Sequence, residues 1–225
     1  MISNTSEIFT TLFNQFLWLG ILVSVVVLGL MAFLIMKNRD RGAATPDPED
    51  APMLGKMPEE RGKIKTVVIS LTLSVTILGV LIIGTFGAID ALNTPPQGTL
   101  NIQVRGFQWG WKFIYPNNYE DTILRVPKDD TVIVKIQSND VAHSFGIIEF
   151  KIKKDAIPGR TNTIWFIPKE TGEYNIVCFE FCGLGHAFMK TKLIVMEPNE
   201  FQEWYSKLKP GDIQHPPVQQ GGQQP

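Results

Sequence analysis

Positive charge is missing from the first twelve residues, which contain no lysine or arginine. A cleaved secretory signal has a positively charged start and an apolar core of about 7–15 residues, so this beginning does not fit one. Charge of either sign is also missing from residues 13–36 and 66–88, which are runs of 24 and 23 residues. About 20 apolar helical residues cross a bilayer core. We therefore predict two transmembrane helices, at about residues 13–36 and 66–90.

The basic residues between the two runs indicate how the helices are oriented. Residues 37–65 contain seven lysines and arginines, whereas the next basic residue after the second run is Arg105. Short loops rich in Lys and Arg stay in the cytoplasm. We therefore place the loop 37–65 on the cytoplasmic side of the cell membrane. The N-terminus and everything after about residue 93 then lie on the outer, extracytoplasmic side.

The outer segment has the pattern of one small β domain. Its charge is balanced, with 14 basic and 13 acidic residues in residues 94–209, and nothing in it points to a nucleic acid partner. Short runs rich in Val, Ile, Thr and aromatic residues occur at residues 99–111, 131–137, 161–167, 173–179 and 191–197. Turn residues such as Pro, Gly and Asn separate them, and this predicts an antiparallel sandwich or barrel.

A short helix and a tail follow the predicted strands. Asn199 can cap a helix at about residues 199–208. One helical stripe is apolar and contains Phe201, Trp204, Tyr205 and Leu208. The stripe packs either on the β domain or on a partner. Residues 209–225 are rich in Pro, Gln and Gly, a composition that predicts a disordered tail.

Both cysteines of the chain, Cys178 and Cys182, lie in the segment VCFEFCGLGHAFM. Two cysteines outside the cytoplasm usually form a disulfide, but a disulfide explains neither His186 nor Met189 in the same segment. Thiolate, imidazole and thioether are together the ligands of a blue-copper site, which takes a further histidine from elsewhere. His143 is the remaining histidine of the predicted domain. Zinc also binds Cys and His, but the soft thioether favours copper.

The second cysteine suggests a second metal ion, since a one-copper site needs only one. Thiolates four residues apart can bridge two copper ions, with His143 and His186 at the two ends. Met189 and a main-chain carbonyl near Glu180 would be weak ligands. Two thiolates against Cu(I) plus Cu(II) leave a single positive charge, and reduction by one electron leaves none. This small change of charge in a fixed ligand cage suits electron transfer.

We call the segment VCFEFCGLGHAFM, residues 177–189, the copper segment. This segment and its surroundings resemble subunit II of the haem–copper respiratory oxidases, the cytochrome c oxidase family. Cys-x-Glu-x-Cys-Gly-x-x-His-x-x-Met at 178–189, with His-Ser-Phe at 143–145, is similar to the family's dinuclear copper centre, CuA. AIDALN, QWGW and DAIPGR are further matches in the family's order. The resemblance implies an N-terminal two-helix transmembrane hairpin at 1–93. It also implies an all-β cupredoxin-like sandwich at 94–208, docked on subunit I, which holds the haems and the oxygen-reducing centre.

The resemblance assigns roles to the residues of the segment. It implies Cys178 and Cys182 as bridging thiolates, His143 and His186 as terminal nitrogen ligands, and Met189 as the thioether ligand.

Other positions receive roles from the resemblance alone. The main-chain carbonyl of Glu180 binds copper in the family, and its side chain can reach a magnesium or manganese ion at the subunit I interface. Trp109 matches the surface aromatic through which the electron enters, although a buried tryptophan is the alternative reading. Asp155 and Arg160 match a loop near subunit I, or form a plain turn. Glu60 is the nearest counterpart of an acid at a proton-channel entrance.

Two departures from the family bear on the electron donor. Gly110 replaces the aromatic residue usual between the two tryptophans, and GIIEFKIKK replaces a proline-containing stretch. A domain that receives electrons from a basic cytochrome c should present acidic surface, yet this one is nearly neutral. Some acidic surface could come from Glu120, Asp121, Asp129, Asp130 and Asp140. The soluble donor is therefore either a cytochrome c or a small blue-copper protein.

The predicted function is electron entry into a membrane-bound, proton-translocating oxygen reductase. Single electrons pass from the soluble donor through the copper centre to the haem of subunit I, and the oxygen chemistry belongs to that partner. The chain itself needs no catalytic acid, base or nucleophile. One alternative is the same subunit of a nitric oxide reductase. Another is a membrane-anchored module for copper binding or delivery, although such modules favour exposed Met- and His-rich sites.

Overall fold

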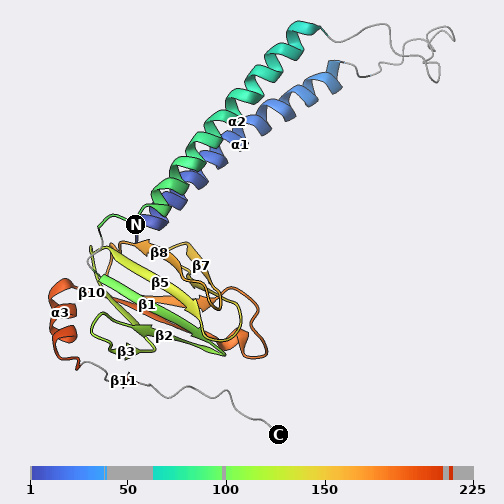
Figure 1. Ribbon diagram of the computed structural model, residues 1–225. Helices are drawn as coiled ribbons and strands as arrows, with labels where there is room; N and C mark the ends of the chain where they lie inside the picture. Colours follow the sequence, from blue (N-terminus) through green and yellow to red (C-terminus); the bar gives the residue numbers. More distant parts are fainter. Residues whose placement is uncertain (1, 38, 40–62, 98–99, 210–212, 215–225) are drawn as a thin grey trace, which may run out of the picture. The chain divides into compact units, whose positions relative to one another are not determined.

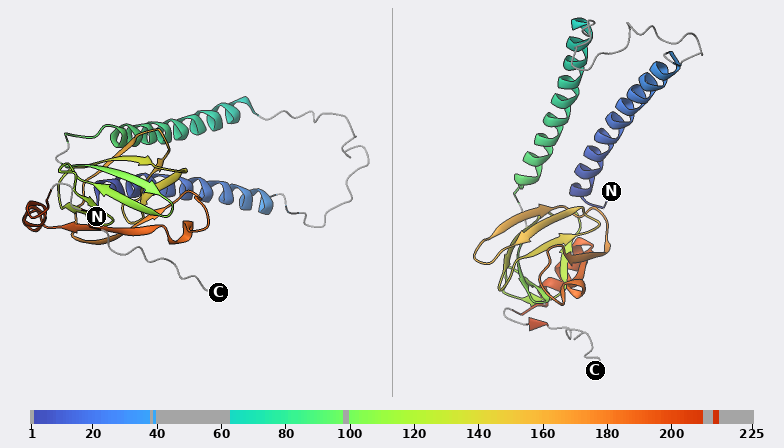
Figure 2. Two further views of the ribbon diagram at one scale, coloured as in Figure 1. Left: turned by 60° about the horizontal axis from the view of Figure 1, so that its bottom comes forward. Right: turned by 90° about the vertical axis from the view of Figure 1, so that its right-hand side faces the viewer.

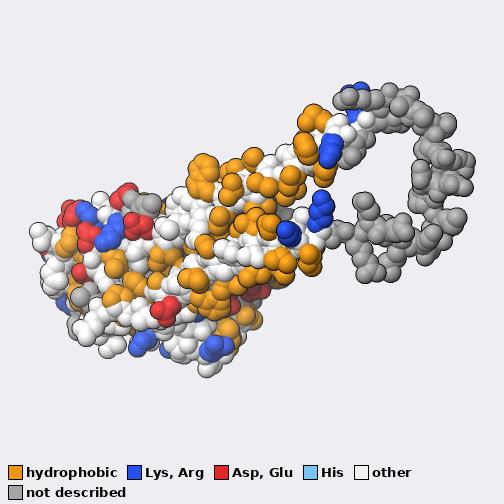
Figure 3. Space-filling model, turned by 90° about the horizontal axis from the view of Figure 1, so that it is seen from above, with side chains coloured by type: hydrophobic (Ala, Val, Ile, Leu, Met, Phe, Trp, Pro, Cys, Tyr) orange, Lys and Arg blue, Asp and Glu red, His pale blue; other side chains and the backbone are white. Residues whose placement is uncertain are grey.

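Two long helices form the N-terminal part of the chain, α1 (Asn4–Lys37) and α2 (Ile64–Asn93) (Figure 1). Both are long and apolar enough to cross a membrane. Figure 3 shows hydrophobic side chains along both helices, with Lys and Arg side chains at the ends that lead into the connecting loop. The computed structural model describes residues 2–37, 39, 63–97, 100–209 and 213–214.

Helix α1 begins at Asn4, well before the predicted residue 13, because polar residues start it. The Ser6 amide donates a 3.1 Å hydrogen bond to Ser3 Oγ, and Ser6 Oγ donates to the Ser3 carbonyl at 2.7 Å. These bonds use polar groups that the start of a helix leaves unsatisfied. Most of the predicted loop 37–65 and of the tail lies outside the described residues, and so does Glu60.

The rest of the chain is a β-sandwich with a short helix, as the views in Figures 1 and 2 show. Its strands are β1 (Leu100–Phe107), β2 (Gly110–Ile114), β3 (Glu120–Asp121), β4 (Leu124–Pro127), β5 (Val132–Ser138), β6 (His143–Ile147), β7 (Ile152–Ala156), β8 (Asn162–Phe166), β9 (Gly172–Cys178), β10 (Lys190–Met196) and β11 (Ile213–Gln214). One sheet has the order β11-β3-β2-β1-β5-β8 and the other β4-β10-β9-β6-β7. The predicted fold class, a helical hairpin followed by an all-β sandwich and a terminal helix, is confirmed. The expectation that the strands pair antiparallel throughout is wrong, because β1 pairs parallel with β5 and β4 pairs parallel with β10.

Strand β6 was not recognised in the sequence, because its residues do not alternate between apolar and polar. All five are buried, and the strand lies between β9 and β7. The Phe179 ring covers Gly146 so closely that a Cβ there would come within 2.3 Å of it. A strand buried on both faces lacks the period-two pattern from which half-buried strands are identified.

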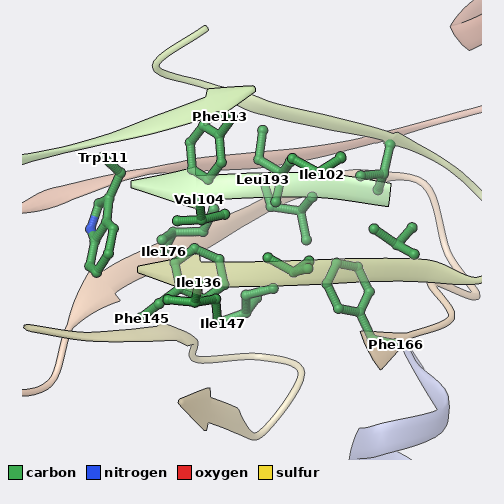
Figure 4. Packing of buried hydrophobic residues seen from close by; sticks show 14 of the residues in the cluster. Ile102, Val104, Trp111, Phe113, Ile136, Phe145, Ile147, Phe166, Ile176 and Leu193 are labelled. Atoms are coloured by element: carbon green, nitrogen blue, oxygen red, sulfur yellow. The ribbon is translucent and has the colours of Figure 1, made fainter. Parts of the chain in front are cut away.

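The core between the two sheets is built from inward-facing side chains of both (Figure 4). Phe145 belongs to this core, and its ring is edge-on to Trp111 at 5.3 Å and to Phe113 at 6.3 Å between centroids. Alternate residues of β1 and β5 supply branched side chains such as Val104 and Ile136, each fully buried. The core thus extends up to the strand ends where the copper segment begins.

The terminal helix α3 (Pro198–Ser206) packs on the sandwich. Of its predicted stripe, Phe201 is buried in the core, and the remaining members are partly buried against it: Trp204, Tyr205 and Leu208. The predicted cap at Asn199 is wrong, because the N-cap is Glu197 and Pro198 is the first helical residue. Proline suits that position since its missing N–H would have no helical partner there.

Candidate metal centre

Two neighbouring strands carry the first ligand candidates to one end of the sandwich. His143 is the first residue of β6 and Cys178 the last of β9, and these strands pair antiparallel, with Phe145 opposite Cys178. The chain then forms a loop and one turn of 3-10 helix, η2 (His186–Phe188). The Cys178 amide donates a 3.1 Å hydrogen bond to the Met189 carbonyl, which closes the loop at its base. Residues 35 positions apart in sequence are thus brought together by strand pairing.

The predicted ligand atoms form a continuous cluster. The two sulfur atoms of Cys178 and Cys182 are 3.9 Å apart. His143 Nδ1 lies 3.9 Å from the Cys178 sulfur, and His186 Nδ1 lies 3.6 Å from the Cys182 sulfur. The structure therefore has an imidazole nitrogen at each end of a central pair of thiols, the order that two bridging cysteines require.

Two weaker donors complete the cluster. The Met189 thioether sulfur is 3.6 Å from the Cys182 sulfur, and the Glu180 main-chain oxygen is 3.2 Å from the Cys178 sulfur. The Glu180 side chain itself is exposed. All six predicted positions therefore converge on one site.

The cluster is buried, and its two cysteines are not joined in a disulfide. Cys178, Cys182 and Met189 are buried, and the His143 ring is wholly inaccessible. Both cysteines are free thiols, and their 3.9 Å separation is about twice the S–S bond length of about 2.05 Å. The ligand atoms of the group His143, Cys178 and Cys182 lie within 4.8 Å of one another, a span suited to a metal ion.

The electrostatics of the thiol pair call for a cation. Burial and the neighbouring Cys178 thiol raise the pKa of Cys182 to about 11. Without metal, the Cys182 sulfur is therefore a neutral thiol at pH 7. Metal binding displaces thiol protons and holds the sulfurs as thiolates beside a positive charge. The donor set of soft sulfurs and imidazole nitrogens fits copper, and it fits zinc poorly because of the thioether.

Asp140 holds the His143 ring in place, a role that sequence analysis missed. Its Oδ1 lies 2.8 Å from His143 Nε2, so that the other ring nitrogen, Nδ1, faces the thiols. Burial raises the pKa of Asp140, but hydrogen bonds from His143 and from the N–H groups of Gln108 and Val141 lower it below its usual value. A carboxylate behind a metal-binding histidine is a common way to fix the ring. In the sequence, the spacing Asp-x-x-His at 140–143 is the only feature that could have indicated this contact.

Trp109 and Trp111 have opposite environments. Trp111 is 2% exposed and its ring lies edge-on to His143, whereas Trp109 is 41% exposed. Trp109 Nε1 donates a 3.2 Å hydrogen bond to the Cys182 carbonyl, which also accepts a 2.7 Å bond from Gln108 Nε2. The alternative reading of Trp109 as the buried tryptophan of the sandwich thus applies to Trp111.

Two glycines let the Trp109 ring lie against the copper segment. Gly183 has φ +116°, a conformation that L side chains rarely adopt. A Cβ at Gly185 would come within 2.3 Å of the Trp109 ring. Gly183 thus allows the chain to turn, and Gly185, which has no Cβ, leaves room for the indole ring of Trp109.

The remaining predicted residues lie beside the cluster. Asp155, in β7, accepts a 2.9 Å hydrogen bond from Ser144 Oγ, next to His143. Arg160 is the last residue of a turn, which its main-chain N–H closes by donating a 3.2 Å hydrogen bond to the Ile157 carbonyl. Arg160 and Asp155 line a surface depression of about 340 Å³ together with Lys153 and Lys154.

The fold and the cluster define a cupredoxin-like domain that follows two helices of membrane-spanning length and apolarity, and that contains a His/Cys/Cys group able to hold a metal ion. Residues 117–197 match the family model described as the periplasmic domain of cytochrome c oxidase subunit II. The chain is 33% identical to the haem–copper oxidase subunit 2 of Aeropyrum pernix, over 90% of each chain. It therefore belongs to the subunit II family of the haem–copper oxidases.

Other relatives extend the comparison. A probable cytochrome c oxidase subunit 2 of Rickettsia bellii is 26% identical, over 85% of this chain and 76% of the relative. A solved periplasmic domain of cytochrome oxidase subunit II (CoxB) from Bradyrhizobium japonicum is 34% identical, covers 50% of this chain and 95% of its own, and has a TM-score of 0.49. Family membership makes the chain a subunit of an oxidoreductase complex, a two-pass membrane protein with its β domain outside, and implies a copper centre.

Proposed function

We propose that this subunit takes single electrons from a soluble donor at its outer domain and passes them to the haem of subunit I of an oxygen-reducing, proton-translocating complex in the cell membrane. The observation that carries the proposal is the continuous cluster of thiols and imidazoles, with 3.9 Å between the sulfurs. A dinuclear copper centre at that cluster supplies a one-electron redox couple. The chain supplies the cage, and subunit I supplies the oxygen chemistry.

The proposed ligands divide into strong and weak donors. Cys178 and Cys182 would hold copper through their thiolates, and His143 and His186 through imidazole nitrogens. Met189 and the main-chain carbonyl of Glu180 are the weak donors, each within 3.6 Å of a cysteine sulfur. The exposed Glu180 carboxylate is free to reach a magnesium or manganese ion at the interface with subunit I. Since every strong donor sits on a strand end or a closed loop, the cage is preorganised and changes little with each electron.

Trp109 is the proposed point of electron entry. Its ring is exposed on one side, and its Nε1 is bonded to the main chain of Cys182. One hydrogen bond and the covalent bonds of Cys182 therefore separate the outer surface from a thiolate. His186, half-buried beyond Cys182, is the proposed exit towards the haem. The burial of the sulfurs favours this fixed redox site over a copper-delivery module, whose ligands must be reachable for exchange.

The test of the proposed function is a metal count on the full chain in detergent without subunit I, so that every ion counted belongs to this chain. The thiols are reduced, copper is added, and the electron paramagnetic resonance spectrum is recorded. We expect two coppers per chain that share one unpaired electron. One copper per chain with a mononuclear spectrum would leave a blue-copper or delivery protein and remove the proposal.

Copper uptake is expected to require a thiol reductant. The two sulfurs lie 3.9 Å apart outside the cytoplasm, where oxidation to a disulfide needs only a short approach. A disulfide does not provide thiolates, so the oxidised metal-free chain should take up less than about a tenth of the copper bound after reduction. The measurement is copper per chain after desalting, with and without a dithiol. Equal loading of both samples would contradict the expectation.

A further inference from the structure

The outer ends of both long helices are bonded to the β-sandwich. By the contacts within the chain, one compact unit comprises Met1–Thr11 and Gly87–Pro225. The first turn of α1 and the last turn of α2 therefore belong to the same unit as the copper cluster. The beginning of a chain is usually poorly ordered unless specific contacts tie it down.

The start of the chain lies along the segment that leaves β8, residues 167–169. Asn4 Oδ1 accepts a 2.7 Å hydrogen bond from the Ile167 amide, and the Asn4 amide donates to the Ile167 carbonyl at 3.3 Å. The Lys169 amide donates a 2.9 Å hydrogen bond to the Ile2 carbonyl. Main-chain groups of 167–169 are thus paired with the start of α1.

Thr5 makes a second contact, with a different loop of the sandwich. Its Oγ1 donates a 2.8 Å hydrogen bond to the Phe150 carbonyl, in the turn that joins β6 to β7. Thr5 is 2% exposed, and its Oγ1 lies 2.9 Å from Oγ of the wholly buried Ser3. Buried polar groups are costly without partners, so these bonds hold the turn and the start of the helix together.

Trp165 attaches the end of α2 to the same region of the sandwich. This residue lies in β8, and its Nε1 donates a 2.9 Å hydrogen bond to the Leu92 carbonyl. Leu92 is among the last four residues of α2, whose carbonyls have no partner within the helix. Strand β8 and the segment after it therefore carry a contact from each long helix.

The Thr5 contact and the copper cluster lie at opposite ends of one buried strand. Strand β6 begins at His143 and ends three residues before Phe150, and all five of its residues are buried. At about 3.3 Å per residue the strand spans roughly 13 Å. A change at Thr5 therefore leaves the donor atoms in place and alters how the domain is held.

We infer that Asn4 and Thr5 are positioning residues for electron transfer. They clamp the copper domain to the outer end of α1, so that the domain does not turn about its single covalent connection to α2. This inference rests on the proposed function, because it concerns the passage of the electron from the copper centre to the haem of subunit I. A domain that samples several orientations transfers electrons only during the fraction of time that it spends in the competent one.

The test uses the full complex with the double variant Asn4→Leu/Thr5→Val, which removes both side-chain hydrogen bonds. The copper centre is reduced by a flash-activated soluble reductant, and the rate at which the haem of subunit I is then reduced is recorded. We expect this rate to fall about fivefold or more while two coppers per chain are retained. The conservative double variant Asn4→Asp/Thr5→Ser keeps the acceptor and the donor, and it should restore the wild-type rate.

Thr10→Val is the matched control. Thr10 Oγ1 donates a 2.8 Å hydrogen bond to the Ser6 carbonyl within α1, so this variant also loses a hydroxyl but leaves the clamp intact. It should keep the wild-type rate. Amide hydrogen exchange of the full chain in detergent reports on the clamp itself. The Ile167 amide, which donates to Asn4, should exchange about tenfold or more faster in Asn4→Leu/Thr5→Val than in the wild type or the control.

Three results would overturn the inference. The first is an unchanged copper-to-haem rate, or an unchanged exchange rate of the Ile167 amide, in Asn4→Leu/Thr5→Val. The second is loss of copper or of subunit I from that variant, which would make the segment an element of folding or assembly. The third is failure of the conservative double variant to restore the rate. One copper in the wild-type chain would contradict the proposed function, whereas exchange of the Ile167 amide would still report whether the clamp forms.

Discussion

The Cys182→Ser variant is expected to lose the two-copper spectrum completely. Its sulfur lies within 3.9 Å of the Cys178 sulfur, the His186 nitrogen and the Met189 sulfur, so it is the hub of the cluster. A serine hydroxyl is a hard, weakly acidic donor and does not replace a bridging thiolate for copper. We expect at most one copper per chain, with a mononuclear electron paramagnetic resonance spectrum.

Met189→Leu is the matched control for that variant. The substitution removes a weak thioether ligand and conserves the volume of a side chain that is 1% exposed. Both bridging thiolates remain, so two coppers per chain and a shared unpaired electron should persist, with changed spectral parameters. Two coppers in Cys182→Ser, or one copper in Met189→Leu, would contradict the proposed division into bridging and weak ligands.

The Phe113→Ala variant is expected to lose about 3–5 kcal/mol of unfolding free energy, the usual cost of emptying a buried phenylalanine site. Phe113 is fully buried and contacts Phe145, whose strand neighbour is Cys178. The cavity would thus lie one side chain away from the copper site. The measurement is denaturant unfolding of the outer domain within the metal-free full chain in detergent, followed by tryptophan fluorescence.

Phe181→Ala makes the same chemical change at a side chain that is 77% exposed. Its unfolding free energy should stay within about 0.5 kcal/mol of the wild type, because surface truncation leaves no cavity. A loss in Phe113→Ala no larger than that in Phe181→Ala would show that the two sheets do not depend on this aromatic contact.

Much of the fold could be predicted because its signals are local. The uncharged runs in α1 and α2 are long enough to predict membrane-spanning helices, and the strands β1, β5 and β9 have the predicted run of β-branched residues. Strand β6 and the start of α1 were missed. The first is buried on both faces and does not alternate, and the second depends on the polar residues Ser3 and Ser6.

The sequence by itself determined the hairpin, the strand-rich outer domain and the chemical identity of the donors in the copper segment, because composition and short spacing carry that information. Only the tertiary structure decided that His143 meets Cys178, since strand pairing joins residues far apart in the chain. It also decided that Trp109 is exposed while Trp111 is buried. The partner of a side chain and its solvent exposure depend on long-range packing, which no local pattern encodes.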